Sequence, residues 1–424
     1  MAYKILMIAP TPFFADRGCH VRILEEIQAL EQLGHKITLC TYHIGRDIPG
    51  SDIRRICRIP WYQKLEAGPS WHKFYLDELL YHKAKSILKK EHFDLIHAHL
   101  HEGVFIASRL RKKFNIPIVA DLQGSLTDEV RAHRFAKNNP FILKIFQYAE
   151  QKINQVPDQI ILSSNQFKEF FAKKFSIPNY KMEVISDGVN SNRANLSIDE
   201  KNRLCNELGI PHHRTIIAFL GILTIYQGIE ILMKIMPSMI QKNSNIHFLI
   251  MGFPKEDHYK KRCVDLGISD HVTWTGRVPY HLIDNYLSCA DIAISPKISK
   301  TEGNVKLMNY MAIGLPMVVF DIPANREILG EYGVYADCGN TEDFEKKLLM
   351  LIDNTQLRVT LRKKLIAFAI NNFSWGMRAK QILRIYEKTS WRIPQTIYTK
   401  ISFLLMGLSQ LSMESLVSWY DAIL

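Results

Sequence analysis

Long apolar runs and paired cysteines are the features that this 424-residue sequence most clearly lacks. No stretch approaches the roughly 20 consecutive apolar residues that a helix needs to cross a bilayer. The seven cysteines are scattered and odd in number, and none forms a Cys-x-x-Cys pair. A disulfide framework or a thiolate metal site is therefore disfavoured, and thiols in a reducing compartment are the better interpretation. The chain enters a strand pattern at once, without a signal segment, so we expect a cytoplasmic protein.

Acidic residues are also in deficit, with 42 Asp and Glu against 54 Lys and Arg, for a net charge of +12. Such an excess favours anionic partners such as phosphates, nucleic acid or a membrane surface, but it does not bear on the fold. The proportions of hydrophobic residues (47%) and charged residues (23%) are ordinary for a globular protein. The length is more than one compact core requires, so we expect two domains.

The first half begins as a βαβ unit. Residues 3–10 form a near-continuous apolar run, as in a strand buried on both faces of a parallel sheet, and a helix pattern then leads to a second strand over residues 36–42. The Gly-x-Gly-x-x-Gly fingerprint is missing, so dinucleotide binding is not supported. Gly18 stands alone at the expected helix start, where a glycine lets a phosphate approach the backbone. A simple turn is the alternative.

Histidines alternate along a strand-like segment, at His97, His99 and His101. Alternate residues point to one side of an extended chain, which raises the question of a zinc site. The distance between alternate side chains, about 6–7 Å, suits three ligands on one ion poorly, so we expect no metal here. We expect polar groups at a strand tip that faces a ligand cleft, joined by the next strand tip at Asp121 and Gln123.

Two stretches are candidates for contact with a membrane. Residues 54–90 interleave basic side chains with aromatic ones, which suits an anionic interface of lipid headgroups or a glycan-phosphate. A solvated helix face with its aromatic residues in the core is an equal alternative. Residues 397–424 carry apolar side chains at helical spacing but are too polar to span a bilayer. This tail is expected to lie on the first domain, on a partner or on a membrane.

A second α/β sheet is predicted beyond residue 209, because strand-like apolar runs alternate there with helical patterns. Gly221 and Gly252 each follow one of these runs, and ligands bind at the carboxyl ends of strands in parallel sheets. Residues 295–316 follow another run and place Glu302 and Gly303 just before a helix pattern. The free N–H groups and the dipole of that helix N-terminus attract phosphate. We therefore predict one cleft for a phosphorylated ligand at this edge.

Four segments together resemble a known family. They are FLGILTIYQGIE at residues 219–230, TGRVPY at 275–280, DGVN at 187–190, and the Glu-Gly loop with its helix at 295–316. In combination they resemble the retaining GT-B glycosyltransferases of family 4 (glycosyl transferases group 1), and the resemblance covers most of the chain.

The resemblance implies an α/β fold in which two Rossmann-like domains face each other across a cleft. The first, acceptor-side domain would span residues 1–190, and the nucleotide-sugar-binding domain residues 191–372. A crossover helix at residues 373–390 would return to the first domain, followed by an amphipathic helical tail at residues 391–424.

The resemblance also implies a reaction. A sugar would pass, with retention of configuration, from a nucleotide-sugar to a glycan or lipid-linked acceptor in cell-surface polysaccharide or glycolipid synthesis. No cofactor, no metal and no nucleic-acid partner are implied. The residues carried over form a catalytic, a donor-binding and an acceptor-side group. The catalytic group is Glu302, Lys306 and His99; the donor-binding group is Gly18, Gly221, Gln227, Gly252, Arg277, Val278, Lys297, Gly303, Asn304 and Asn309; the acceptor-side group is His101, Glu102, Asp121 and Gln123.

Three positions depart from the family pattern. Asn309 stands where the second of two glutamates is usual, and Ile222 and Gln227 occupy the places of the arginine and lysine that hold the donor phosphates. Negative charge develops on the leaving diphosphate during transfer, so a cation is needed there. We predict that Lys306, together with Lys297, supplies it. A catalytically weakened binding subunit is the alternative, and a sugar-nucleotide epimerase is a less favoured one.

Overall fold

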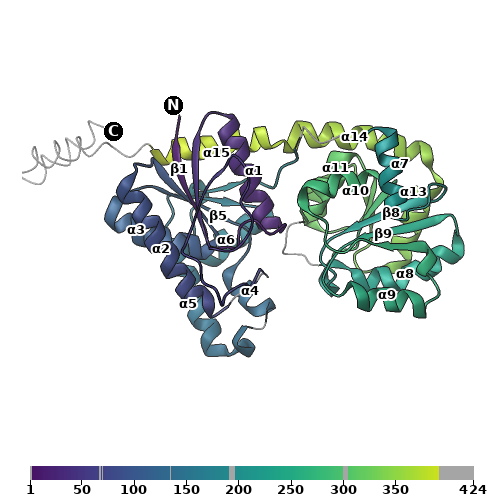
Figure 1. Ribbon diagram of the computed structural model, residues 1–424, viewed down its shortest axis with the longest axis horizontal. Coiled ribbons are helices and arrows are strands. Elements are labelled where there is room, and N and C mark those ends of the chain that lie inside the picture. The colour runs from purple at the N-terminus through teal and green to yellow at the C-terminus, as the bar shows by residue number, and fades with distance from the viewer. Residues whose placement is uncertain are drawn as a thin grey trace, which may run out of the picture.

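Two parallel sheets organise the chain in the computed structural model, which describes residues 2–65, 68, 70–133, 135–190, 196–298 and 304–390 (Figure 1). The first sheet has seven strands in the order β3-β2-β1-β4-β5-β6-β7, and all its strand pairs are parallel. Its strands are β1 (Lys4–Ala9), β2 (Lys36–Thr41), β3 (Asp52–Arg55), β4 (Leu95–His99), β5 (Ile118–Leu122), β6 (Gln159–Leu162) and β7 (Met182–Val184). The helical segments between them are α1 (Gly18–Gln32), α2 (His72–Lys90), α3 (Leu100–Phe114), α4 (Leu126–Ala132), η1 (Phe135–Asn138), α5 (Pro140–Asn154), α6 (Asn165–Phe175) and η2 (Asn179–Lys181).

The second sheet has six strands in the order β10-β9-β8-β11-β12-β13, again all parallel. Its strands are β8 (Thr215–Leu220), β9 (Ile246–Met251), β10 (Val272–Trp274), β11 (Ile292–Ser295), β12 (Met317–Phe320) and β13 (Val334–Ala336). Its helical segments are α7 (Ile198–Glu207), η3 (Ile225–Gln227), α8 (Ile229–Lys242), α9 (Glu256–Asp265), η4 (Ser269–His271), η5 (Tyr280–Leu282), α10 (Ile283–Ser288), α11 (Lys306–Ile313), α12 (Pro323–Leu329), α13 (Thr341–Asp353), α14 (Thr355–Phe373) and α15 (Trp375–Ser390).

Burial on both faces explains why the central strands are nearly continuous apolar runs. In β1, Leu6 and Ile8 pack into the core on one face of the sheet, and Ile5 and Met7 pack into the core on the other. All six residues of β9 are buried. Among the described residues, no helix has the length and apolar character that crossing a membrane requires.

The end of the chain returns to the first domain, as Figure 1 shows for α14 and α15. The segment that leaves the first domain, at Val189, pairs with the segment that returns to it, at residues 373–375. Val189 N–H donates to the Phe373 carbonyl (2.7 Å), and Trp375 N–H donates to the Val189 carbonyl (3.1 Å). Gly188 is required there, because a Cβ atom would lie 2.7 Å from the Trp375 ring and 2.9 Å from the Phe373 oxygen. Helix α15 then packs along α1, with Tyr386 buried in the core they share.

The domains touch at the carboxyl edges of their sheets. Tyr280, after β10, donates its backbone N–H to Asp16 (2.9 Å) and its hydroxyl to Glu25 (2.7 Å) on the β1–α1 side. On the other side, the Asn165 side chain donates to Glu327 of α12 (2.9 Å). The predicted tail, residues 391–424, lies outside the described residues.

Candidate active site

One half of the site lies at the carboxyl ends of β8 and β9. Gly221 follows β8, and its N–H donates to the carbonyl of Met251 at the end of β9 (3.0 Å). A Cβ atom on Gly252 would lie 2.4 Å from the Gly221 carbonyl oxygen and 2.6 Å from Leu223. The two predicted glycines therefore let neighbouring strand ends come into backbone contact, which forms the floor of the site.

Lys306 points at this floor from the first turn of α11. Its Nζ lies 3.0 Å from the position that a Cβ atom on Gly221 would occupy, and 4.6 Å from the centre of the Phe219 ring. The Nζ atom is buried and has no hydrogen-bond partner among the described residues. Burial, followed by the nearby charge of Lys297, lowers the pKa of Lys306 to about 7. A buried ammonium group without a counter-charge is costly, so this position suits an anionic ligand.

Helix α11 is held in place through Tyr310. Its hydroxyl accepts a hydrogen bond from the Leu220 N–H (2.8 Å) and donates to the Ile294 carbonyl (3.3 Å). These bonds tie the helix to the ends of β8 and β11. The position of Lys306 beside Gly221 therefore follows from packing of the helix and not from a contact of the lysine itself.

The loop after β8 contributes further buried polar atoms. Thr224 Oγ1 and Gln227 Oε1 lie in this loop, are buried, and have no hydrogen-bond partner among the residues that the structure describes. Lys297, after β11, is 1% exposed. Gly228 has a φ of +89°, and a Cβ atom there would lie 2.1 Å from the Pro296 carbonyl oxygen, so the loop lies directly against the segment that carries Lys297.

Asn304 has a supporting position beneath the predicted donor site. Its amide donates to Ser295 Oγ (3.0 Å) and to Asn325 Oδ1 (2.9 Å), and Asn325 in turn donates to the Phe320 carbonyl (2.8 Å). Both amide hydrogens of Asn304 are thus engaged within the protein, where they order the start of α11. Asn309 is half-buried farther along α11.

The remaining donor-side predictions lie around this floor or beyond the described residues. Arg277 is exposed, with its guanidinium 4.0 Å from the centre of the Phe253 ring, and Val278 is buried. Gly18 is exposed at the start of α1, and a Cβ atom there would have no neighbour within 4 Å. Glu302 and Gly303 lie outside the described residues.

A cavity of about 500 Å³ in the first domain forms the other half of the site. Three of the predicted acceptor-side residues, His101, Glu102 and Gln123, line it. Tyr226, from the loop after β8, reaches it from the second domain. The wall also carries aromatic and charged residues that the sequence did not single out: Arg17, Tyr42, Tyr62, Lys64, Lys73, Asp128, Glu129, Phe167 and Phe170. Of these, Tyr62, Lys64 and Lys73 belong to the basic and aromatic stretch, but nothing in the pattern assigned them to a cavity.

Charges on the cavity wall are partly paired. Lys73 Nζ lies 2.6 Å from Glu102. Burial acts to raise the pKa of Glu102, but the charge of Lys73 and the hydrogen bond from it, together with smaller contributions, lower the pKa. Behind the wall, the Tyr42 hydroxyl donates to Asp77 (2.5 Å), and burial together with the charge of Glu102 raises the pKa of Asp77 to about 7.

Two other wall residues have free polar atoms. His101 Nε2 lies 3.7 Å from Glu150, too far for a hydrogen bond, and it and Gln123 Nε2 have no hydrogen-bond partner in the described part of the chain. Ser125 and the Leu126 N–H hold Glu150 from the other side, at 2.7 and 2.9 Å. Both atoms are buried, so the wall contains two polar groups that are unsatisfied among the described residues.

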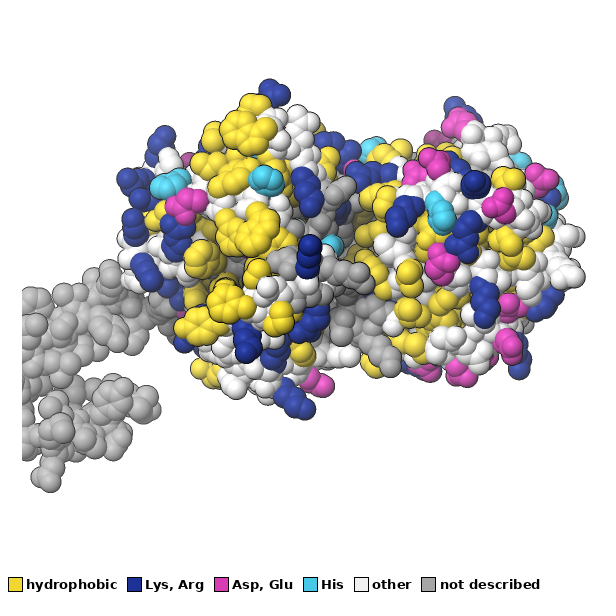
Figure 2. All heavy atoms as spheres, turned by 90° about the horizontal axis from the view of Figure 1, so that it is seen from below, with side chains coloured by type: hydrophobic (Ala, Val, Ile, Leu, Met, Phe, Trp, Pro, Cys, Tyr) yellow, Lys and Arg dark blue, Asp and Glu magenta, His cyan; other side chains and the backbone are white. Residues whose placement is uncertain are grey.

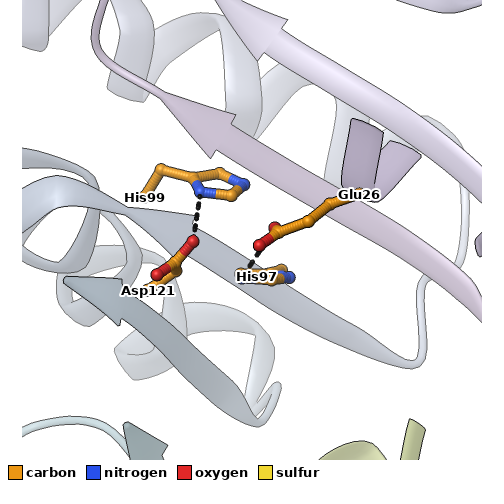
Figure 3. A group of neighbouring side chains, drawn as sticks. All are labelled: Glu26, His97, His99 and Asp121. Carbon is orange, nitrogen blue, oxygen red and sulfur yellow. Dashed lines mark ion pairs between the residues drawn. The ribbon is translucent and has the colours of Figure 1, made fainter. Parts of the chain in front are cut away.

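His99 and Asp121 lie in the interior and do not line the cavity. They form a buried group with His97 and Glu26, drawn in Figure 3. Asp121 lies 3.4 Å from His99 Nδ1, and Glu26 lies 3.9 Å from His97 Nε2. These four side chains offer atoms within 4.8 Å of one another that could ligate a metal, whereas the sequence predicted a poor spacing for His97, His99 and His101.

Arg22 supplies positive charge within this group. Its Nε lies 2.7 Å from Asp121 and 3.0 Å from Glu26. Burial acts to raise the pKa of Asp121, but the charge of Arg22, followed by the interaction with His99, lowers it below its usual range. Burial and then the charge of Asp121 raise the pKa of Glu26 well above its usual value. The Arg22 guanidinium thus faces the carboxyl groups of Asp121 and Glu26, and also that of Asp187 at 3.1 Å.

The same group anchors the crossover helix. His97 Nδ1 lies 2.7 Å from the hydroxyl of Tyr386 on α15. Burial, followed by the charge of His99, lowers the pKa of His97 well below its usual value. Within this group, His97 connects β4 to α15 and Asp121 connects β5 to α1.

Known proteins share this arrangement of two facing parallel sheets. Sucrose-phosphate synthase from Thermosynechococcus elongatus superposes with a TM-score of 0.75 at 17% identity, over 91% of this chain and 98% of that structure. Anabaena HepE, solved with UDP and glucose, superposes with a TM-score of 0.70 at 15% identity, over 90% and 98% of the two chains. These likenesses confirm the predicted α/β fold as GT-B.

The sequence comparisons define the family. Residues 17–193 match the family described as Glycosyltransferase Family 4, and residues 200–369 match Glycosyl transferases group 1. The chain belongs to family 4 of the GT-B glycosyltransferases. It is 24% identical to an uncharacterized glycosyltransferase, MJ1607, of Methanocaldococcus jannaschii, over 91% of this chain and 98% of that protein. It is 21% identical to the phosphatidyl-myo-inositol mannosyltransferase of Mycolicibacterium smegmatis, over 91% and 94% of the two chains.

Proposed function

We propose that this glycosyltransferase moves a sugar from a nucleotide-sugar to a glycan or lipid-linked acceptor, with retention of configuration and without a metal ion. The donor diphosphate would bind at the ends of β8 and β9, and the acceptor in the cavity of the first domain. The single observation that carries the proposal is the buried Lys306 ammonium beside Gly221. The UDP and glucose bound to HepE, and the mannosyl transfer to a phospholipid named for the mycobacterial relative, support the two substrate classes.

The chemistry asked of Lys306 is charge stabilisation. As the acceptor oxygen bonds to the anomeric carbon, the bond from that carbon to the diphosphate oxygen breaks. The nucleoside diphosphate leaves with the electron pair, and its oxygen takes up the proton of the acceptor hydroxyl. An ammonium already in place, in a site from which water is excluded, stabilises this developing charge without reorganisation. Because Lys306 and Lys297 bring positive charge to this edge of the sheet, the diphosphate need not recruit a divalent cation.

One observation supports the alternative, in which the protein is a subunit that binds the donor but does not turn it over. Ile222, in the place of a family cation, is 41% exposed beside the floor of the site, so this side chain adds apolar surface where charge is usual. A subunit of this kind would bind a nucleoside diphosphate and release no product.

A panel of nucleotide-sugars, assayed for hydrolysis and transfer, separates these functions. We expect turnover with one donor, an anomeric configuration in the product equal to that of the donor, and unchanged turnover in chelator. Lys306→Ala should lower turnover by two or more orders of magnitude, as loss of a group aimed at developing charge does. Lys346→Ala, which removes an exposed lysine of α13, is the matched control. Near-normal turnover of Lys306→Ala would refute the assignment, and binding without any turnover would favour the subunit.

A further inference from the structure

A group of large apolar side chains is exposed on the first domain. Figure 2, which views the molecule from below, shows hydrophobic side chains gathered over this domain with Lys and Arg around them. The exposed residues of this surface, called here the aromatic face, are Trp61, Leu65, Trp71, Phe74, Phe141, Ile145 and Tyr148. Trp61, Phe141 and Tyr148 are 79%, 71% and 66% exposed. Contiguous exposed apolar surface of this kind marks an interaction site.

Helix α5 presents its apolar stripe outward. Phe141, Ile145 and Tyr148 recur at the spacing of one helix face, and all three are exposed. The buried side chains of α5 are the polar Glu150 and Asn154. Ile142, Phe146 and Ile153 are half-buried on the other side of the helix, so the exposed residues are apolar surface in excess of the stripe that a helix turns toward its core.

Ring contacts join α5 to the segment before α2. The Trp71 ring lies 4.7 Å from that of Phe135 and 5.8 Å from that of Phe74. Phe135 in turn lies 5.9 Å from Phe146 of α5. Residues from both segments therefore form one surface.

The charge of these segments is one-sided. Residues 56–74 and 135–149 contain five Lys and Arg and a single acidic residue, Glu66. One of the five, Lys73, is paired with Glu102, which leaves Arg58, Lys64, Lys137 and Lys144 as exposed cations. Just beyond them, the Lys152 ammonium lies 5.4 Å from the centre of the Tyr148 ring.

The basic residues at the start of the predicted interface, in contrast, are paired elsewhere. Arg54 lies 2.8 Å from Asp52, and Arg55 lies 2.7 Å from Asp47. The stretch predicted as an interface, residues 54–90, therefore has two parts. Its arginines on β3 form ion pairs, and its aromatic residues near the start of α2 belong to the same surface as α5.

We propose that the aromatic face docks the protein on an anionic lipid membrane. Aromatic rings with exposed cations beside them match the boundary between acyl chains and anionic headgroups. Tyr62, Lys64, Gly68 and His133, which flank the face in sequence, line the cavity of the first domain. If the proposed function holds, docking therefore places the cavity beside the headgroup layer, and the acceptor is lipid-linked.

Flotation of the full-length protein with vesicles tests the docking without any need for activity. We expect binding to vesicles of equal parts phosphatidylcholine and phosphatidylglycerol, and much weaker binding to phosphatidylcholine alone. The triple change Phe141→Ser, Ile145→Ser and Tyr148→Ser should lower partitioning at least about tenfold, because three apolar side chains lose their burial in the bilayer boundary. Lys137→Gln and Lys144→Gln should each lower it about fivefold, on the anionic vesicles only.

The matched control alters exposed apolar residues of the second domain: Val264→Ser, Met350→Ser and Val359→Ser, at positions 66%, 41% and 45% exposed. This control should float as the wild type does. Undiminished flotation of the α5 variant would overturn the proposal. So would a wild-type dimer that the α5 changes dissociate, since the face would then meet a second copy of the chain. Turnover of nucleotide-sugar, measured without vesicles, tests the proposed function separately.

Discussion

Replacing Lys306 by Met should make the protein without bound donor more stable near neutral pH and should remove part of its pH dependence. Methionine keeps the length of the side chain and removes the charge. The pKa of Lys306 is lowered from its ordinary value of 10.5 to about 7 in the folded chain. The unfolded state therefore binds more protons between these values, and stability rises with pH across this window.

The magnitude follows from the two pKa values. Integrated over pH 7 to pH 9, the linkage adds about 2 kcal/mol to the free energy of unfolding of the wild type. Lys306→Met lacks this increment. At and below pH 7 the folded wild type bears most of the free-energy cost of burying the charged Lys306. The variant should therefore be more stable than the wild type there, by a few kcal/mol in order of magnitude.

Urea unfolding at a series of pH values from 6 to 10, followed by tryptophan fluorescence, measures both effects. Other titrating groups are shared, so the difference between wild type and variant isolates Lys306. Lys346→Met, on the exposed surface of α13, supplies the control for a lysine-to-methionine change. Parallel pH curves for wild type and Lys306→Met would refute the burial of this ammonium group without a partner among the described residues.

Two further predictions concern the supports of the site. Arg22→Met leaves Asp121 buried without its guanidinium, so the free energy of unfolding should fall by about 3–5 kcal/mol, measured by urea unfolding; an unchanged midpoint would mean that the buried group has another counter-charge. Gly252→Ala places a Cβ atom 2.4 Å from the Gly221 oxygen, so stability should fall by about 1–3 kcal/mol and nucleoside-diphosphate affinity, measured by calorimetry, should fall with it. Gly376→Ala, where a Cβ atom would have no neighbour within 4 Å, should change neither.

Much of the fold could be predicted from local pattern. Strands of a parallel sheet covered on both faces are apolar throughout. The apolar runs at residues 3–10 and before Gly252 therefore predict strands. The glycines that follow these runs predict a close approach of two backbones, because such an approach leaves no room for a Cβ atom. Chain order alone therefore predicted a donor site at one edge of the second sheet.

The electrostatic state of the site depends on contacts that no local pattern encodes. Lys306 has the sequence signature of a solvated lysine near a helix start. It is unusual only because Phe219 and Gly221, distant along the chain, remove water from it and Lys297 adds a like charge. Likewise, His99 and Asp121 resemble residues of a strand tip, but Arg22 and Tyr386 converge behind them to form a buried network.

The sequence by itself determined where the strands end and which glycines stand there, because these properties depend on neighbours along the chain. Only the tertiary structure decided which charged groups are buried and which apolar groups are exposed. The aromatic residues of α5 show this most plainly: periodicity gives the helix a stripe, but the packing of Glu150 beneath Ser125 and Thr127 turns that stripe outward. Burial is a property of the assembled fold, and the charge of Lys306 and the exposure of Phe141 both follow from it.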